Sequence, residues 1–434
     1  MSTSPAVDRV SAGDRSVGGA RTRALAARGA ALFAARRDAV IWFLPAVYAL
    51  WVGQRRKTAE PLGPDANGYF ELSAGFDAGT WFHGVREPLW PAMNAIPMLV
   101  FGENPDILRY MGLLTFAGLV LAAQYLTREM LGRWVAVAVG FVLASSDWLA
   151  AQSTLGLREV LAALMALVVC LAAIRLRPGW QGPLLLGLLV GAAALIRWDT
   201  LIMTLPVVAL TFYLRRVGWR QVAAATGVLV VLVVPFCIGN AVVYGDPVYH
   251  SNIHAVFFRN IEFVGQSGYP TKQDLVERGS YTGGSETWPH YIFARHSLGW
   301  VADHTTRGSA RTILQNGSLL LFNGTAESPA VQTPTLTLLG SNATLLPWLL
   351  ALLSLAGALV LLVRGAWPVS VMFVLAVLQH APIAHLMDPR LGLTAAPFMV
   401  IAVAACVVAL WSRLLGAVAA TVGDRAAKRH SGLV

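Results

Sequence analysis

The sequence predicts an all-α polytopic membrane protein, and three observations support this. Of 434 residues, 56% are hydrophobic and 13% are charged, and the mean hydropathy is +0.59. A soluble domain carries charge on about a quarter of its residues. Apolar runs recur along the chain, and arginines lie in the short connections between them. The composition therefore excludes an ordinary soluble protein.

The net charge of +10 comes mainly from arginine. In a soluble domain such a charge would indicate a nucleic-acid partner, but here it lies in short loops, as membrane orientation requires. We therefore expect no nucleic-acid binding. The three cysteines, Cys170, Cys237 and Cys406, lie in apolar runs and are expected to pack as small hydrophobic side chains.

Both ends of the chain are basic. Residues 1–37 are rich in Ser, Gly, Ala and Arg without an apolar stripe, and we expect a disordered cytosolic tail there. A twin-arginine signal or a transit peptide is the alternative. Since no small-residue cleavage site follows the apolar run at 39–53, a retained first helix is favoured. Residues 413–434 are expected to form a second basic cytosolic tail.

About ten apolar runs are candidates for membrane-crossing helices. An untilted span needs about 20 residues, and several runs are shorter, above all those of the hairpin at 183–214. The runs delimit an N-terminal transmembrane module over 38–240 and C-terminal transmembrane helices over 341–412. The predicted spans are 39–53, 105–126, 134–148, 156–174, 183–196, 200–214, 221–239, 341–363, 367–383 and 391–412.

The positive-inside rule orients these spans. With the amino terminus in the cytosol, most arginine-rich connections fall on the cytosolic side, and the run at 55–57 is the main exception. The polar clusters then share the extracytoplasmic side. They comprise a first outer loop (54–104), a loop region with short helices (241–340), and the surroundings of Asp147, Arg197 and Arg390.

Within the first outer loop, residues 88–101 are apolar but too few to cross a bilayer. We expect a juxtamembrane helix that lies in the membrane interface. Trp81, Trp90 and Phe101 are its predicted interfacial anchors.

The first outer loop also carries a dense polar pattern. An Asp is followed four residues later by a Tyr, then by Glu-x-Ser, Gly-x-Trp, an Arg-Glu-Pro segment and Phe-Gly-x-Asn. The residues are Asp65, Tyr69, Glu71, Ser73, Gly79, Trp81, Arg86, Glu87, Pro88, Phe101, Gly102 and Asn104. This order resembles the GT-C superfamily of glycosyltransferases that use polyprenyl-phosphate sugars, especially the branch of lipid A aminoarabinose transferases and protein O-mannosyltransferases.

Later segments extend the resemblance to about residues 40–410. They are Leu157-Arg158-Glu159, the stretch 187–206 with Arg197 at its turn, and Asp388-Pro389-Arg390. The resemblance implies a GT-C-like bundle whose first outer loop is catalytic. The sequence departs from the family in the region 241–340, which does not align, and in the second outer loop, which lacks an Asp-x-Asp pair.

Sugar transfer from a lipid phosphate needs a base for the acceptor hydroxyl and positive charge for the departing phosphate. The resemblance implies that Asp65 is the base, since the family's catalytic Asp stands at the matching place. Without that motif, Asp65 would be interpreted as a loop residue that caps a short helix. The implied reaction is a single displacement that inverts the anomeric carbon.

Arginines at the outer ends of spans can grip phosphate oxygens with two N–H groups, although each can also simply reach lipid headgroups. Arg390 is the first choice among them. The carboxylates nearby can position substrate or remain solvated charges. The predicted substrate-binding residues are Tyr69, Glu71, Arg86, Glu87, Asp147, Arg158, Glu159, Arg197, His385, Asp388 and Arg390.

No metal ligands are predicted. His250 and His254 have the i, i+4 spacing that can share a metal on one helix face, but no third ligand accompanies them. The sequence therefore does not establish a cofactor, and a bound divalent metal stays an open alternative.

The predicted function is that of an integral membrane glycosyltransferase. It would move a monosaccharide from a polyprenyl-phosphate donor to a hydroxyl of a glycan, lipid or protein, at the extracytoplasmic face of the cell inner (plasma) membrane. A flippase for lipid-linked sugars is one alternative, although paired repeats and polar midplane breaks are not evident. An enzyme of the O-antigen ligase or polymerase type is the other, which the large region 241–340 keeps open.

Overall fold

The computed structural model describes residues 38–57, 61–322, 345–383 and 389–431, and the secondary structure of these residues is entirely helical. The all-α prediction is thereby confirmed. The basic tail at 1–37 and the predicted site residues His385 and Asp388 lie outside the described residues.

Every predicted span coincides with a helix. Residues 38–56 are helical, and the later helices of the N-terminal module lie near the predicted bounds. The first and the last of them each continue five residues past the predicted end, and the helix Asp147–Thr154 lies mostly between two predicted spans. These later helices are α5 (Asp106–Leu131), α6 (Arg133–Ala144), α7 (Asp147–Thr154), α8 (Glu159–Ile174), α9 (Gln181–Ile196), η1 (Trp198–Thr200), α10 (Leu201–Leu214) and α11 (Trp219–Tyr244).

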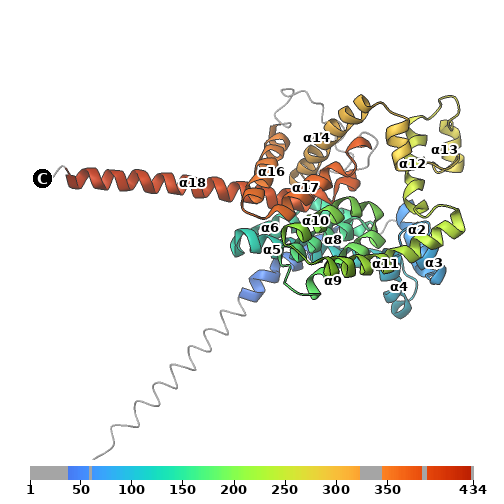
Figure 1. Cartoon of the computed structure of the whole chain (residues 1–434), viewed down its shortest axis with the longest axis horizontal. Helices are drawn as coiled ribbons and strands as arrows, with labels where there is room; N and C mark the ends of the chain where they lie inside the picture. Colours follow the sequence, from blue (N-terminus) through green and yellow to red (C-terminus); the bar gives the residue numbers. More distant parts are fainter. Residues whose placement is uncertain (1–37, 58–60, 323–344, 384–388, 432–434) are drawn as a thin grey trace, which may run out of the picture.

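The C-terminal spans are helical too. They correspond to α16 (Leu345–Val363), α17 (Trp367–Leu378) with the short η3 (Ala381–Ile383), and η4 (Pro389–Gly392) followed by α18 (Ala395–Ser431). α18 continues through most of the basic tail predicted at 413–434, and it projects away from the other helices (Figure 1).

Length and composition together qualify three described helices as membrane-crossing: α5, α11 and the first 22 residues of α18. A fourth qualifies if α6 and α7, which meet at 61°, form one broken span. Six further apolar helices have 10–17 residues. The protein is therefore a membrane protein, and the figure of about ten spans stays a prediction.

The first outer loop folds into three helices, α2 (Pro64–Ala74), α3 (Ala78–His83) and α4 (Leu89–Phe101). α4 covers the stretch predicted as a juxtamembrane helix, and its Leu99, Val100 and Phe101 are exposed. Trp90, however, is not an interfacial anchor. Its ring is fully buried and its Nε1–H donates to the carbonyl of Gly156, so it fixes the loop to the bundle.

The region predicted as an outer loop at 241–340 contains α12 (Tyr249–Glu262), α13 (Lys272–Arg278), η2 (His290–Ala294) and α14 (Leu298–Phe322). α14 has 25 residues, which is longer than the short helices expected there. It packs against α16, α17 and α18 and so belongs structurally with the C-terminal helices.

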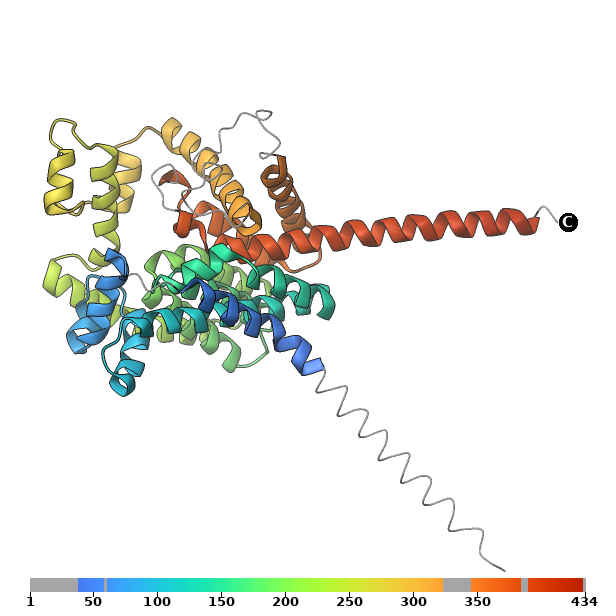
Figure 2. The same cartoon turned by 180° about the vertical axis from the view of Figure 1, so that it is seen from behind.

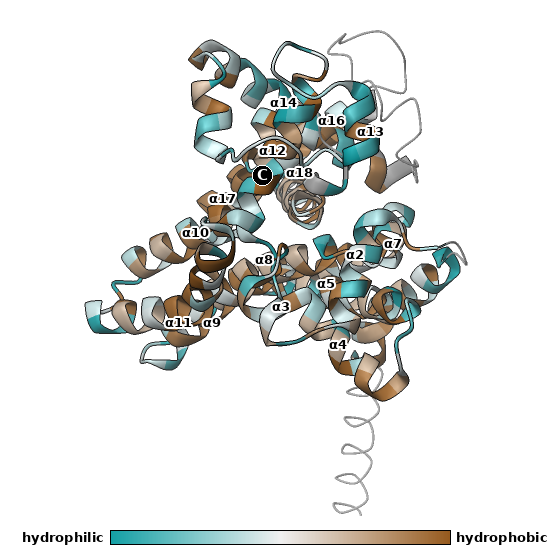
Figure 3. Ribbon diagram, turned by 90° about the vertical axis from the view of Figure 1, so that its right-hand side faces the viewer, coloured by the Kyte–Doolittle hydropathy of each residue, from teal (hydrophilic) through white to brown (hydrophobic). Residues whose placement is uncertain are grey.

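Helices of the bundle pack closely where glycine permits. α16 packs along α18, and a Cβ added at Gly357 would lie 1.7 Å from the carbonyl oxygen of Ala402. α9 packs along α11 in the same way. The opposite side of α11 is apolar and exposed, and in Figure 3 α11 is largely brown whereas α14 is largely teal. An apolar, outward-facing helix is what contact with lipid requires.

The arrangement brings α2, α3 and α12 to one end of the molecule, away from the projecting part of α18 (Figures 1 and 2). At the amino end of α5, two cationic side chains that contradicted the positive-inside pattern are neutralised. Arg56 pairs with Asp147, and Lys57 Nζ lies 2.6 Å from Asp106 Oδ2.

Candidate functional site

A cavity of about 720 Å³ lies between the first outer loop, the bundle and α12. Its polar wall comes from α2, the segment before α4, the start of α8, the α9–α10 turn, the end of α17 and η4. The charged side chains of this wall are four arginines and four carboxylates: Arg86, Arg158, Arg197, Arg390, Asp65, Glu87, Glu159 and Asp199.

Asp65 occupies the centre of the most accessible charged cluster. Arg86 Nη2 donates to its Oδ1 at 3.0 Å, and Arg390 Nη2 donates to its Oδ2 at 2.5 Å. One carboxylate thus faces two guanidinium groups, which leaves this cluster with a net positive charge. The Asp65 side chain is 37% exposed, so a ligand in the cavity can reach it.

Glu87 and Arg158 form a second, sealed pair. Their side chains are in contact and only 4% and 7% exposed. Glu87 Oε1 also accepts from the backbone N–H of Trp198 at 2.7 Å, and Arg158 Nη1 donates to the carbonyl of Ile196 at 3.1 Å. The pair therefore ties the first outer loop to α8 and to the α9–α10 turn.

A third cluster links that turn to α17. Arg197 Nε lies 2.9 Å from Asp199 Oδ1, and His380 Nε2 lies 2.8 Å from Asp199 Oδ2. Asp199 was not among the predicted site residues, although it follows Arg197 at a turn between apolar runs. His380 could have been found because an ionisable side chain within an apolar span is a functional candidate.

The apolar contacts below the loop explain why Asp65 points into the cavity. Ala66 and Tyr69, on the same helix, are buried against Trp90, Leu108 and Leu157. The Tyr69 ring packs beneath the guanidinium of Arg86, whose Cζ lies 4.6 Å from the ring centroid. Burial of one helix face thus leaves the Asp65 side on the cavity.

The opposite wall is formed by α12 and η2 and is mainly apolar. One side of α12 lines the cavity with His254, Phe257, Phe258 and Ile261, and Ile292 and Phe293 continue the surface. Residues of this wall pack on Ile383 in η3.

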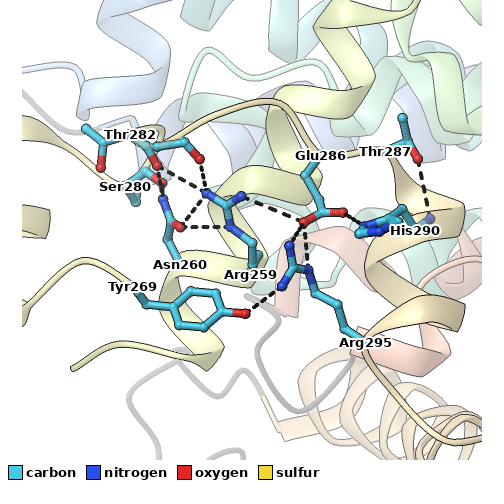
Figure 4. A network of polar contacts seen from close by, with 10 residues as sticks. Arg259, Asn260, Tyr269, Ser280, Thr282, Glu286, Thr287, His290 and Arg295 are labelled. Atoms are coloured by element: carbon cyan, nitrogen blue, oxygen red, sulfur yellow. Dashed lines mark hydrogen bonds and ion pairs between the residues drawn. The ribbon is translucent and has the colours of Figure 1, made fainter. Parts of the chain in front are cut away.

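Figure 4 shows the polar network that braces this wall from behind. Glu286 accepts from Arg295 Nε at 2.7 Å and contacts His290 and Arg259. Asn260, next to Arg259 on α12, donates to the carbonyls of Ser280 and Thr282. These contacts fix α12 to the chain around 280–295, so the wall is a folded part of the site.

Burial and nearby positive charge shift the pKa values of the acids of the site in opposite directions. Burial raises the pKa of Asp65, but Arg390 and Arg86 outweigh it and hold this pKa below its usual range. Burial raises the pKa of Glu87 too, and Arg158 lowers it below its usual range. Both groups are therefore carboxylates at neutral pH. Burial lowers the pKa of His254 to about 4, so its ring is neutral there.

Of the predicted site residues, eight line the cavity: Asp65, Tyr69, Arg86, Glu87, Arg158, Glu159, Arg197 and Arg390. Two lie outside its lining. Glu71 accepts from Asn67 on the exposed side of α2, and Asp147 pairs with Arg56.

The potential metal ligands of the part of the chain that the structure describes lie apart from one another or are already paired. Among the described residues, no three His, Cys, Asp or Glu side chains gather closely enough to hold an ion. His250 lies buried against Trp198 and Phe236, with centroid distances of 5.2 and 4.8 Å. The Asp65 and Glu87 oxygens already accept from arginine or backbone N–H groups. Among the described residues that line the cavity, arginines carry the positive charge.

No protein-family model matches the sequence, and no curated protein matches it. Solved structures are similar in fold. The oligosaccharyltransferase AglB from Archaeoglobus fulgidus, in complex with an inhibitory peptide and a dolichol-phosphate, is 16% identical with a TM-score of 0.48. The match covers 88% of this chain and 52% of that chain.

ArnT from Cupriavidus metallidurans bound to undecaprenyl phosphate is 14% identical with a TM-score of 0.37, and the match covers 86% of this chain and 78% of that chain. Both neighbours are membrane glycosyltransferases of the GT-C superfamily, which the first outer loop resembles. At these identities the likeness concerns the fold alone. The chain spans about half the length of the AglB chain that it matches.

Proposed function

We propose that this protein transfers a monosaccharide from a polyprenyl-phosphate donor to an acceptor hydroxyl at the extracytoplasmic face of the membrane. The observation that supports this proposal is the Asp65 carboxylate between Arg86 and Arg390, at the polar wall of a cavity whose other wall is apolar. A phosphate, a sugar and an isoprenoid chain need those environments side by side.

The donor phosphate binds at the Asp65 cluster in this proposal. Glu87 and Asp199 each have a guanidinium partner within a sealed pair or turn, whereas Asp65 has two. The second guanidinium carries positive charge that an anion can neutralise. Guanidinium also matches phosphate oxygens through two parallel N–H bonds.

Asp65 then acts as the base. When the phosphate takes over Arg390 and Arg86, the carboxylate loses the two groups that depress its pKa, and the phosphate adds negative charge nearby. Donor binding therefore makes Asp65 a better proton acceptor at the moment when a base is needed.

In the reaction step, the acceptor oxygen attacks the anomeric carbon and the bond from that carbon to the phosphate oxygen breaks. The hydroxyl proton passes to Asp65, and polyprenyl phosphate leaves with its charge held by Arg390 and Arg86. The products are the glycoside with inverted configuration and the free lipid phosphate, so atoms and charge balance.

The test is a transfer assay in membranes that contain the protein. Radiolabelled polyprenyl-phosphate hexoses or pentoses are added, and the glycan, lipid and protein fractions are examined for label. Positioned base catalysis contributes about 10²- to 10⁴-fold. We expect Asp65→Asn to lose a rate factor of this size with normal expression.

Asp303→Asn is the matched control, because Asp303 pairs with Arg307 on the exposed side of α14, away from the cavity. It should transfer at the parental rate. Transfer at that rate by Asp65→Asn would contradict the assignment of the base. Movement of labelled lipid between leaflets with no bond broken would instead identify a flippase.

A further inference from the structure

We propose that Glu159, Gln379 and His380 form the subsite that recognises hydroxyl groups of the transferred sugar. This inference rests on the proposed function, since it assigns the sugar-specific part of the same cavity. All three side chains line the cavity.

Each of the three has a buried polar atom without a hydrogen-bond partner among the described residues. The atoms are Glu159 Oε2, Gln379 Oε1 and His380 Nδ1. Glu159 is 9% exposed and His380 is 8% exposed. A buried polar atom without a hydrogen-bond partner destabilises the folded protein. Because all three residues line one cavity, a ligand bound there can complete these hydrogen bonds once the side chains turn toward it.

The three residues come from two helix ends. Glu159 is the first residue of α8, where the helix dipole favours a negative charge, and Gln379 and His380 follow α17. α8 packs against α17, so the residues at these two helix ends line the same cavity.

The available atoms are all acceptors. A carboxylate oxygen and an amide oxygen can only accept. His380 Nε2 lies 2.8 Å from the Asp199 carboxylate and 3.2 Å from Arg197 Nη2, and the closer, acidic partner assigns the proton to Nε2. In that tautomer Nδ1 is an acceptor as well.

A ligand that satisfies three acceptors must supply donors. The ionised phosphate and the isoprenoid chain of the donor have none, whereas a sugar has several hydroxyl groups. The Asp65 cluster therefore binds the phosphate, and the acceptors at α8 and α17 bind the sugar. A site built in this way discriminates strongly against an analogue that lacks one hydroxyl, because the acceptor is then left unpaired.

The experiment compares a polyprenyl-phosphate sugar that the full-length parent transfers with its monodeoxy analogues. Glu159→Gln replaces a carboxylate by an amide of the same shape. Loss of a hydrogen bond to a charged group lowers an affinity by about 10- to 100-fold, so kcat/KM for the complete sugar should fall by that factor. The ratio of kcat/KM for the complete sugar to kcat/KM for at least one deoxy analogue should fall by the same factor.

Inhibition by polyprenyl phosphate without a sugar is the second readout. Its inhibition constant should stay unchanged in Glu159→Gln, since the phosphate binds at Arg390 and Arg86. A merely structural defect would instead weaken both the complete sugar and the bare lipid phosphate.

Gln379→Met removes one acceptor and leaves the buried charge unchanged. It should reduce the preference for the complete sugar over the analogue that lacks a different hydroxyl, and this test remains if Glu159→Gln does not fold. Glu103→Gln, at an exposed carboxylate outside the cavity, is the matched control. Unchanged sugar preference in the folded variants would overturn the subsite and leave the transferase standing. Absence of any transfer by the parent would overturn both.

Discussion

Two guanidinium groups hold Asp65, and this contact sets the behaviour of the site in the absence of substrate. The acid is kept ionised, oriented and weakly basic. Glu87 is equally ionised, but its partner Arg158 and the Trp198 N–H enclose it. Removing one member of such a buried pair leaves an uncompensated charge. We therefore assign Glu87 a positioning role, and in the proposed reaction the more exposed Asp65 is the base.

The difference between the pKa of Asp65 in the free protein and in the proposed donor complex predicts how kcat and kcat/KM depend on pH. In the free protein its pKa lies below its usual value of about 3.9, so the carboxylate form and kcat/KM persist below that pH. In the proposed donor complex we expect a higher pKa, because the phosphate would replace the carboxylate as partner of the arginines. As the pH falls, kcat should therefore decline before kcat/KM does.

Steady-state rates measured at each pH with varied donor concentration separate the two parameters. Asp65→Asn should show no decline of this kind in its residual rate. Coincident acid limbs for kcat and kcat/KM would contradict the exchange of arginines between Asp65 and phosphate.

The sequence predicted the residues of this cluster better than their pairing. Asp65 and Arg86 belong to one local motif, and Arg390 stands before a span, so each could be selected from its neighbours in sequence. The contact between Asp65 and Arg390 joins residues 325 apart, and no local pattern encodes it. Glu71 belongs to the same motif, but the helical path of α2 turns it away from the cavity.

At the scale of elements, the apolar helices were predictable because length and hydropathy are local properties. α14 was not predicted as a long helix. It carries Ser, Thr, Arg and Asn throughout, and only one side, with Ile313, Leu314 and Leu319, is buried. Its partners α16, α17 and α18 follow later in the chain, so its burial depends on tertiary packing.

The contact between α11 and α3 predicts a sharp difference between two glycines of one helix. A Cβ at Gly239 would lie 1.9 Å from the carbonyl oxygen of Phe82, whereas a Cβ at Gly227 meets nothing within 4 Å. Gly239→Ala should displace α3 and with it the first outer loop, which lowers both the melting temperature and the transfer rate.

Gly227→Ala is the matched control, and it should stabilise the protein by about 0.5–1 kcal/mol, since alanine favours a helix interior over glycine. Melting in detergent and the transfer assay measure both variants. Equal melting temperatures and transfer rates of the two variants would show that the position of α3 does not depend on its close contact with α11.

At the scale of the whole molecule, the site and the arginine-rich connections occupy opposite ends of the same helices. α8 begins at Glu159 in the cavity and ends next to Arg175, which pairs with Glu129 near the end of α5. At 1.5 Å per residue, the 16 residues of α8 separate these ends by roughly 24 Å. With these connections in the cytosol, the positive-inside rule predicts that the cavity faces the extracytoplasmic side.

That orientation can be tested by labelling single cysteines in intact cells. Val276 on α13 is 81% exposed and Trp219 at the start of α11 is 75% exposed, so a cysteine at either position is accessible from its own side. In a Cys237→Ala background the remaining cysteines, Cys170 and Cys406, are buried. A membrane-impermeant maleimide should label Val276→Cys in intact cells and Trp219→Cys only after lysis. The reverse pattern would place the cavity on the cytosolic side, where an extracytoplasmic transfer cannot occur.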